Sequence, residues 1–229
     1  MRVLRGRAAD VDADRAVTEH LVADAAETGE PAVRVWTPHP QVAFGRRDAR
    51  EPGYDRARRV ARDRGFPPYE RETGGRAVAY TGTTVAFCRA APVADLRSGI
   101  EERYDEAVAL VRAALADCGV EAQRGEPDHA FCPGAHSLSA EGKLVGIAQR
   151  VGQGVARVGG VLVVRDHEAI EDVLAPVYDA LDVPFDPGTV GSVARARGVP
   201  PATVAPGEVA RTLERHLVGD ATPTIERVA

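Results

Sequence analysis

One stretch organises the chain, and it reads FCPGAHSLSAEGKLVGIAQR over residues 131–150. It places Cys132 directly before a Pro-Gly pair, and a few residues later it contains Lys143. Of the 29 basic residues in the chain, Lys143 is the only lysine, and the other 28 are arginines. Lysine is normally among the commonest residues. Its loss everywhere else indicates that position 143 needs an ammonium group.

Arginine replaces lysine on almost any solvated surface, but not where chemistry depends on the amine. A guanidinium stays protonated, whereas an ammonium is a compact charge whose pKa can be moved by burial. Lys143 is therefore a candidate catalytic residue. The alternative is a lysine that survives on the rim of a solvated β-turn at Glu141-Gly142.

Cys132 also has two interpretations. A free cysteine is commonly a small buried hydrophobe. Pro133-Gly134, however, predicts a turn directly after it, and turns bury side chains poorly. A cation stabilises a nearby thiolate, and the thiolate is the reactive form of the group. We therefore predict that Cys132 is a nucleophile with Lys143 as its partner.

The length and composition suit one domain of ordinary size, because the chain has 229 residues and 44% of them are hydrophobic. We predict a single domain over residues 1–220 and a short C-terminal tail over residues 221–229. No run approaches the ~20 apolar residues of a membrane span, and residues 1–5 lack the apolar run of a secretory signal. We expect a soluble protein with no membrane partner.

The cysteines and the charges argue against disulfide-rich, metal-binding and nucleic-acid-binding proteins. Three cysteines, at positions 88, 118 and 132, show no paired spacing, which argues against a disulfide framework and a zinc or other metal site. A reduced, cytoplasmic compartment follows. The net charge of −5 comes from interspersed acidic and basic residues without a basic stripe, so we expect no nucleic-acid partner.

Periodicity predicts an α+β fold with a mixed, mainly antiparallel sheet flanked by helices, because helices surround several hairpins without a βαβ rhythm. A Ser98–Glu101 capping box is predicted to open one helix. Residues 77–80 and 84–88 are predicted to form a β-hairpin around a turn at 81–83, with Cys88 in the core. The expected helices are 10–27, 54–64, 100–118, 168–181 and 206–217, and the other expected strands are 32–36, 41–45 and a meander over 144–164.

Two separated motifs carry a family resemblance: Arg71-x-x-Gly74-Gly75-x-Ala77-Val78 and Gly142-Lys143-x-x-Gly146-Ile147-Ala148-Gln149-Arg150. At these residues the chain resembles the lipoate/octanoate protein ligase and transferase family, which is related in fold to biotin protein ligases. The resemblance implies that the glycine-bearing loop cradles an acyl chain and that the lysine lies against the reacting carbonyl. The substrate-binding residues that it implies are Arg71, Gly74, Gly75, Ala77, Val78, Gly134, Gly146, Ala148 and Gln149.

Within that family, Cys132 makes the chain look most like the cysteine-dependent octanoyl amidotransferases. The resemblance then implies transfer of an octanoyl or lipoyl group from glycine cleavage H protein to lipoyl domains of 2-oxoacid dehydrogenases, without a cofactor. Without ATP, such transfer needs a covalent intermediate, so Cys132 would form an acyl-thioester. Lys143 would stabilise the thiolate and take the proton of the incoming amine, and backbone amides near Gly74-Gly75 or Lys143 would hold the oxyanion. Apolar residues of the 77–88 hairpin would line a tunnel for the acyl chain.

Three alternatives stay open. The first is an ATP-dependent lipoate ligase that uses ATP and Mg²⁺, with Cys132 a bystander, although Arg76 stands where ligases usually carry a third glycine. The second is a non-catalytic acyl-binding module on the same fold. The third is a Cys–His dyad of a thiol hydrolase, because His129 and His136 flank the cysteine.

Overall fold

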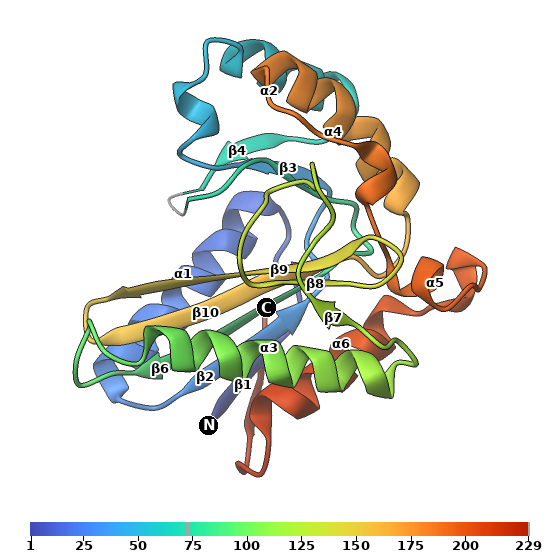
Figure 1. The fold of residues 1–229 in the computed structure, drawn as a ribbon. Helices are drawn as coiled ribbons and strands as arrows, with labels where there is room; N and C mark the ends of the chain where they lie inside the picture. The colour runs from blue at the N-terminus through green and yellow to red at the C-terminus, as the bar shows by residue number, and fades with distance from the viewer. Residues whose placement is uncertain (72–73, 229) are drawn as a thin grey trace.

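The computed structural model describes residues 1–71 and 74–228. Its centre is an eight-stranded sheet with the strand order β11-β1-β2-β6-β10-β9-β8-β7 (Figure 1). The strands in that order are β11 (Thr224–Arg227), β1 (Arg2–Arg5), β2 (Ala32–Trp36), β6 (Val85–Pro92), β10 (Val155–Leu162), β9 (Lys143–Gly152), β8 (Ser137–Ser139) and β7 (Gln123–Arg124). Strand β1 runs parallel to β2 and β11, and the other pairs are antiparallel. The predicted mixed, mainly antiparallel sheet is confirmed.

The last residues of the described chain form a strand of this sheet. Residues 221–229 are predicted from the sequence to be a tail, but β11 pairs with β1 along its whole length, from Arg2 opposite Thr224 to Arg5 opposite Arg227. The Arg2 guanidinium donates to both carboxylate oxygens of Glu226, at 3.0 Å each. The domain therefore extends beyond residue 220. Four residues without an apolar run give no strand signal that periodicity could detect.

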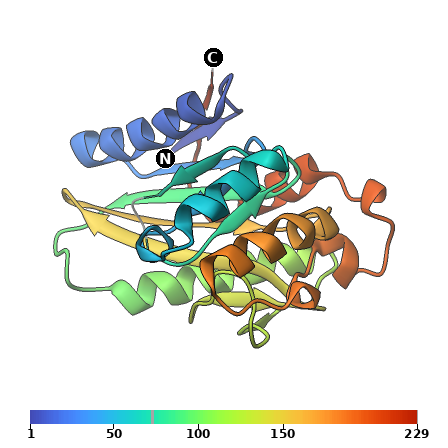
Figure 2. The same ribbon diagram turned by 90° about the horizontal axis from the view of Figure 1, so that it is seen from above.

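A second, three-stranded sheet lies over part of the large one (Figure 2). It has the order β4-β3-β5, with β4 (Pro68–Glu70), β3 (Gln41–Phe44) and β5 (Val78–Tyr80). Helices α2 (Tyr54–Asp63) and α4 (His167–Leu181) lie side by side and cover it. Phe44, Ala57 and Leu174 form the centre of this core, and Phe131 joins it. The small sheet thereby brings the cysteine loop against α4.

The predicted hairpin of residues 77–88 is wrong. Strand β5 pairs with β3 in the small sheet, whereas β6 pairs with β2 and β10 in the large one. The intervening turn carries the chain from one sheet to the other, and Thr83 Oγ1 donates to Asp166 there at 2.7 Å. Alternating apolar residues predict a strand but not its partner, which is why neighbouring strands suggested a hairpin.

Three long helices flank the large sheet. Helices α3 (Ile100–Asp117) and α6 (Pro206–Val218) pack on one face, and α1 (Val11–Thr28) packs on the other with the small sheet (Figure 1). Helix α1 begins at an Asp10 cap and ends at Gly29 in the left-handed conformation. Helix α3 begins where predicted, but without the capping box, because Gly99 is its cap and no side chain bonds its first amides. The short helices are η1 (Asp48–Arg50), η2 (Pro187–Thr189), α5 (Val193–Ala196) and η3 (Pro201–Thr203).

The face of the large sheet toward α1 and the small sheet carries small residues. The register aligns Ala86 and Cys88 of β6 with Val161 and Gly159 of β10, and these with β9. Directly paired residues point to the same side of a sheet. Small side chains on neighbouring strands leave room above this part of the sheet, whereas the opposite face is filled by larger apolar residues such as Phe87 and Ile147.

None of the helices in the described part of the chain combines the length and apolar character that crossing a lipid bilayer requires. Among residues 1–71 and 74–228, no group of three or more His, Cys, Asp or Glu side chains is arranged to hold a metal ion.

Candidate active site

Cys132 lies in the loop between β7 and β8, and its backbone is held in an unusual conformation. Its φ of 42° is in the left-handed region, which non-glycine residues seldom adopt. The Cys132 N–H donates to the hydroxyl of Tyr178 at 2.6 Å, and that hydroxyl donates to the carbonyl of Ala77 at 3.0 Å. Burial raises the pKa of Tyr178 well above its usual value, so the hydroxyl stays a donor. Tyr178 on α4 thus links the cysteine loop to the start of β5.

The sulfur faces two donors from the glycine-bearing loop. The Arg71 Nη2 group lies 3.5 Å from Cys132 Sγ, and the backbone N–H of Arg76 lies 3.4 Å from it. The two donors place one positive charge and one backbone amide against the sulfur. Among the described residues, these are the only donors to Sγ. The prediction placed Arg71 among the substrate-binding residues, and the structure brings its guanidinium to the Cys132 sulfur.

Gly75 permits this approach. Its φ is 89°, and a Cβ built on it would lie 2.8 Å from Cys132 Sγ and 2.9 Å from Arg71 Nη2. Any side chain at this position would therefore displace the sulfur or the guanidinium. Gly74 has open space around it and contributes its carbonyl to Arg71, at 3.1 Å from Nη2.

Arg71 is fixed by the backbone around it. Its Nη1 donates to the carbonyl of Ala43 at 2.8 Å, and its Nη2 donates to the carbonyl of Arg76 at 2.6 Å. Burial acts to lower the pKa of the guanidinium, but its electrostatic interactions with Cys132, the neighbouring tyrosines and Asp48 outweigh burial, and the net shift is upward. Its position and charge are therefore set before any substrate binds.

Lys143 opens β9 and lies beneath the cysteine loop. Its side chain is 1% exposed, and its Nζ donates to Glu126 Oε2 at 2.6 Å, to the carbonyl of Phe131 at 2.9 Å and to that of Cys132 at 2.7 Å. These three bonds use every N–H of an ammonium. The structure thus brings the two predicted catalytic residues together, but the ammonium binds the backbone of the cysteine rather than its sulfur.

Glu126 completes this arrangement and was not predicted from the sequence. Besides Lys143, its carboxylate accepts from the Gly134 N–H at 2.7 Å and from Ser137 Oγ at 2.8 Å. Glu126, Lys143, Gly134 and Ser137 therefore clamp the loop on both sides of Cys132. Nothing in the spacing of Glu126 distinguishes it from the chain's other acidic residues. Tyr178 was missed for a similar reason, because it sits in an apolar helix face.

Of the other predicted substrate-binding residues, two lie at the start of β5 and two lie on β9. Ala77 is buried and Val78 half-buried at the start of β5, close to Cys132 through Tyr178. Gly146 lies against Lys143, since a Cβ there would lie 3.6 Å from the lysine Cε. Ala148 is exposed and shares the face of β9 with Gly146.

Gln149 is not at this site. Its side chain donates to the carbonyl of Ile100 at 3.0 Å and accepts from Arg103, and its N–H donates to the Tyr104 hydroxyl. All three partners belong to α3, on the other face of the large sheet. The proposed flanking base His136 is also engaged elsewhere, because its ring stacks on Tyr104 with centroids 3.6 Å apart.

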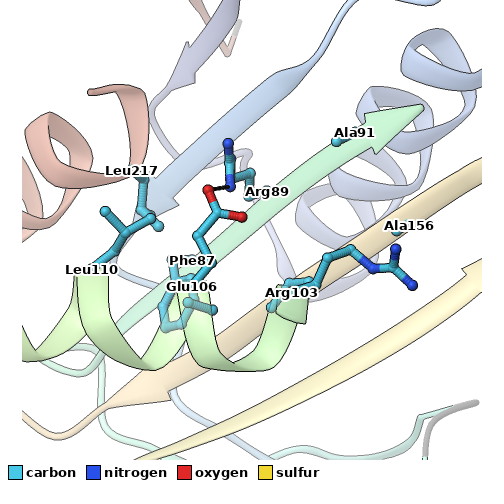
Figure 3. A pocket seen from close by; sticks show the side chains of 10 residues that line it. Phe87, Arg89, Ala91, Arg103, Glu106, Leu110, Ala156 and Leu217 are labelled. Atoms are coloured by element: carbon cyan, nitrogen blue, oxygen red, sulfur yellow. Dashed lines mark hydrogen bonds and ion pairs between the residues drawn. The ribbon is translucent and has the colours of Figure 1, made fainter. Parts of the chain in front are cut away.

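A hollow of about 100 Å³ lies on that same distal face, between the sheet and helices α3 and α6 (Figure 3). Phe87, Leu110 and Leu217 line it, and Arg89 and Glu106 form an ion pair at its edge with a separation of 2.7 Å. The sheet separates this hollow from Cys132.

The chain is similar to known proteins in both sequence and fold. Residues 10–198 match the model of the lipoyl protein ligase A/B catalytic domain. The chain belongs to the lipoyl protein ligase A/B catalytic domain family. The fold prediction is confirmed by a crystal structure of lipoate-protein ligase A bound with ATP, which superposes with a TM-score of 0.76 at 19% identity, covering 100% of this chain and 89% of the other.

Curated relatives are also similar in sequence. An octanoyl-[GcvH]:protein N-octanoyltransferase from Exiguobacterium sibiricum is 36% identical over 59% of this chain and 49% of the relative. One from Kyrpidia tusciae is 33% identical over 66% of the chain and 56% of the relative. A lipoyl-[GcvH]:protein N-lipoyltransferase from Listeria monocytogenes is 29% identical over 54% of this chain and 45% of the relative. The chain spans about half the length of the curated relatives that it matches.

Proposed function

We propose that this protein transfers an octanoyl or lipoyl group between lysine side chains of carrier proteins, through a thioester on Cys132. The observation that carries the proposal is the position of the Cys132 sulfur, which faces the Arg71 guanidinium and the Arg76 amide on a rigidly held loop. The names of the relatives support the same chemistry. The donor would be glycine cleavage H protein, and the acceptors would be lipoyl domains of 2-oxoacid dehydrogenases.

The first half-reaction forms the thioester. Cys132 Sγ attacks the carbonyl carbon of the acylated lysine, a C–S bond forms, and the amide C–N bond breaks. The proton that leaves the thiol ends on the departing lysine amine. The Arg71 guanidinium and the Arg76 N–H, which face the sulfur, would stabilise the negative charge that develops on the carbonyl oxygen.

The second half-reaction reverses the first with a new amine. The acceptor lysine attacks the thioester carbonyl, the C–S bond breaks, and the amine's proton returns to sulfur. Lys143 acts in both steps as a positioning residue, because its three N–H groups hold Glu126 and the loop carbonyls. The acyl chain would lie on the small-residue face of the large sheet, next to Gly146 and Ala148, rather than in the tunnel of a hairpin.

No cofactor takes part in this scheme, because the thioester keeps the acyl group activated. We place the reaction in the cytoplasm. The three cysteines are unpaired in the structure, which suits a reducing compartment.

Intact-mass analysis tests the proposal. Wild-type protein and a Cys132→Ser variant are incubated with octanoylated H protein without ATP. We expect an octanoyl adduct on the wild type alone, removed by hydroxylamine. If neither protein is acylated, and ATP with lipoate modifies an added lipoyl domain, the protein is a ligase and Cys132 has no covalent role.

A further inference from the structure

The arginines of this chain are unevenly distributed, and one segment beside the site holds an excess. Residues 46–64, which span η1 and α2, contain eight arginines and four acidic residues. The whole chain has the opposite balance, with 29 basic and 34 acidic residues. Seven of the eight are exposed, and one of these, Arg56, pairs with Asp179. Five of the exposed arginines form what we call the basic surface: Arg46, Arg47, Arg50, Arg59 and Arg62.

The acidic residues nearest η1 do not neutralise this surface. Asp48 is fully buried, and it and Glu51 bind Arg76, at 3.4 Å and 2.7 Å. Arg76 belongs to the glycine-bearing loop, so both carboxylates are used to attach η1 to that loop. Within the described part of the chain, the five arginines of the basic surface form no ion pair, which leaves their charge available to a partner.

The basic surface is linked to Cys132 through Gly75 and Gly45. Gly75 lies against Cys132 Sγ, and Gly45 packs so closely on the Gly75 carbonyl that a Cβ would not fit. Arg46 and Arg47 follow Gly45 directly. The Gly45 N–H also donates to Asp48 Oδ2 at 2.9 Å, which fixes the turn into η1. Arg46, Arg47 and Arg50 therefore emerge from the rim of the site.

We propose that the basic surface docks an acidic face of the carrier domain whose lysine reaches Cys132, an inference that rests on the proposed function. A carrier must cover the rim of the site to deliver a lysine side chain, so a charged rim is in its path. The surface also extends along α2, which is about 15 Å long and also exposes Asp55 and Asp63. That span is longer than a single phosphate or carboxylate group and suits a folded domain with several acidic residues. Opposite charges on two such surfaces accelerate encounter and set orientation.

The test compares two donors on one variant, Arg46→Glu/Arg47→Glu/Arg50→Glu. With octanoylated H protein, we expect kcat/KM for transfer to fall at least about tenfold and its dependence on salt to weaken, because rim charges act mainly on association. With p-nitrophenyl octanoate, a neutral small donor that needs no docking, we expect Cys132 to be acylated at the wild-type rate.

A matched control carries the same charge change on the distal face, as Arg112→Glu/Arg211→Glu/Arg215→Glu in α3 and α6. We expect it to transfer from H protein at the wild-type rate. An equal loss in the control, an equal loss with the small ester, or transfer from H protein that does not change would each overturn the proposal. Binding of anionic phosphatidylglycerol vesicles that requires the basic surface, with carrier transfer unchanged, would also overturn it and assign the surface to a membrane.

Docking and chemistry can be separated. Calorimetry with Cys132→Ser protein and H protein measures binding without turnover, and we expect the basic-surface variant to weaken this binding. If wild-type protein forms no thioester with either donor, the proposed function fails. If the thioester forms but binding does not depend on the basic surface, only the docking proposal fails.

Discussion

Lys143 and Arg71 both approach Cys132, and they act on different parts of it. The Lys143 ammonium is almost fully buried and holds the loop through two backbone carbonyls and Glu126. The Arg71 guanidinium meets the sulfur, and it is held in turn by carbonyls of the small sheet and the glycine-bearing loop. One cation holds the backbone of the cysteine loop, and the other faces the sulfur.

The difference follows from the chemistry of the two groups. An ammonium is a compact charge that can satisfy three acceptors in a small buried space, whereas a planar guanidinium is larger and presents several donors in a fixed plane. The Lys143 side chain is 1% exposed and its ammonium already meets three acceptors, so a larger planar group would have to displace them. The survival of one lysine in an arginine-rich chain is thus explained by the geometry of a buried site.

The largest effect is expected for Lys143→Met. The change leaves the partly buried Glu126 carboxylate, whose side chain is 15% exposed, without its cationic partner, and we expect the free energy of unfolding in urea to fall by about 3 kcal/mol. The double variant Lys143→Met/Glu126→Gln should recover part of this loss, because it removes the unpaired charge. Unchanged stability together with lost transfer would show that Lys143 acts in the chemistry and not on the loop.

The next effect is expected for Arg71→Met, measured as the rate at which p-nitrophenyl octanoate acylates Cys132. Removal of a fixed donor beside the reacting atoms typically slows such a step about 100-fold. Arg71→Lys keeps the charge and should lose less. A wild-type rate in Arg71→Met would contradict the assignment of this cation to the sulfur.

A smaller effect is expected for Tyr178→Phe, which leaves the Cys132 N–H and the Ala77 carbonyl without their partner. We expect a loss of about 1–2 kcal/mol in the free energy of unfolding. Because burial raises the pKa of Tyr178 above its ordinary value of 10, this contribution is present in full below pH 10 and disappears as pH rises through the raised value. The difference in unfolding free energy between the wild type and Tyr178→Phe should therefore be the same at pH 7 and pH 9. A difference that is smaller at pH 9 would contradict this prediction.

The smallest effect is one of selectivity among the thiols. Burial raises the pKa of Cys88 and of Cys118, so both have less thiolate at neutral pH than a free cysteine. Iodoacetamide at pH 7.5 should therefore alkylate Cys132 first, as peptide mapping by mass spectrometry would show. The Cys132→Ser protein serves as the control and should stay unlabelled over the same time. Equal labelling of Cys118 would contradict the expected protection.

The sequence alone predicted the elements well, because helices and strands have periodic patterns. It also pointed to Cys132 and Lys143, since residue rarity and a Pro-Gly turn are local signals. An 11-residue separation does not tell which atoms meet, however, and here Nζ binds a carbonyl of the cysteine. The chemical role of Lys143 stays a prediction for the stability test above.

Other features depend on contacts between distant segments, which no local pattern encodes. Tyr178 meets Cys132 across 46 residues, and its helix periodicity indicates only that it is buried. Strand β5 was assigned to β6 because the two are adjacent in sequence, although packing placed them in different sheets. Glu126 is one of 34 acidic residues, and only the fold shows that it is the one beside the ammonium.

The pairing of β1 with β11 has a consequence for synthesis. Arg2 and Thr224 are neighbours in the sheet, so one edge of β1 stays uncovered until residues 224–227 have left the ribosome. During that interval the growing polypeptide exposes unpaired backbone groups, which invite association with other nascent chains. The yield on expression should therefore respond to the speed of translation.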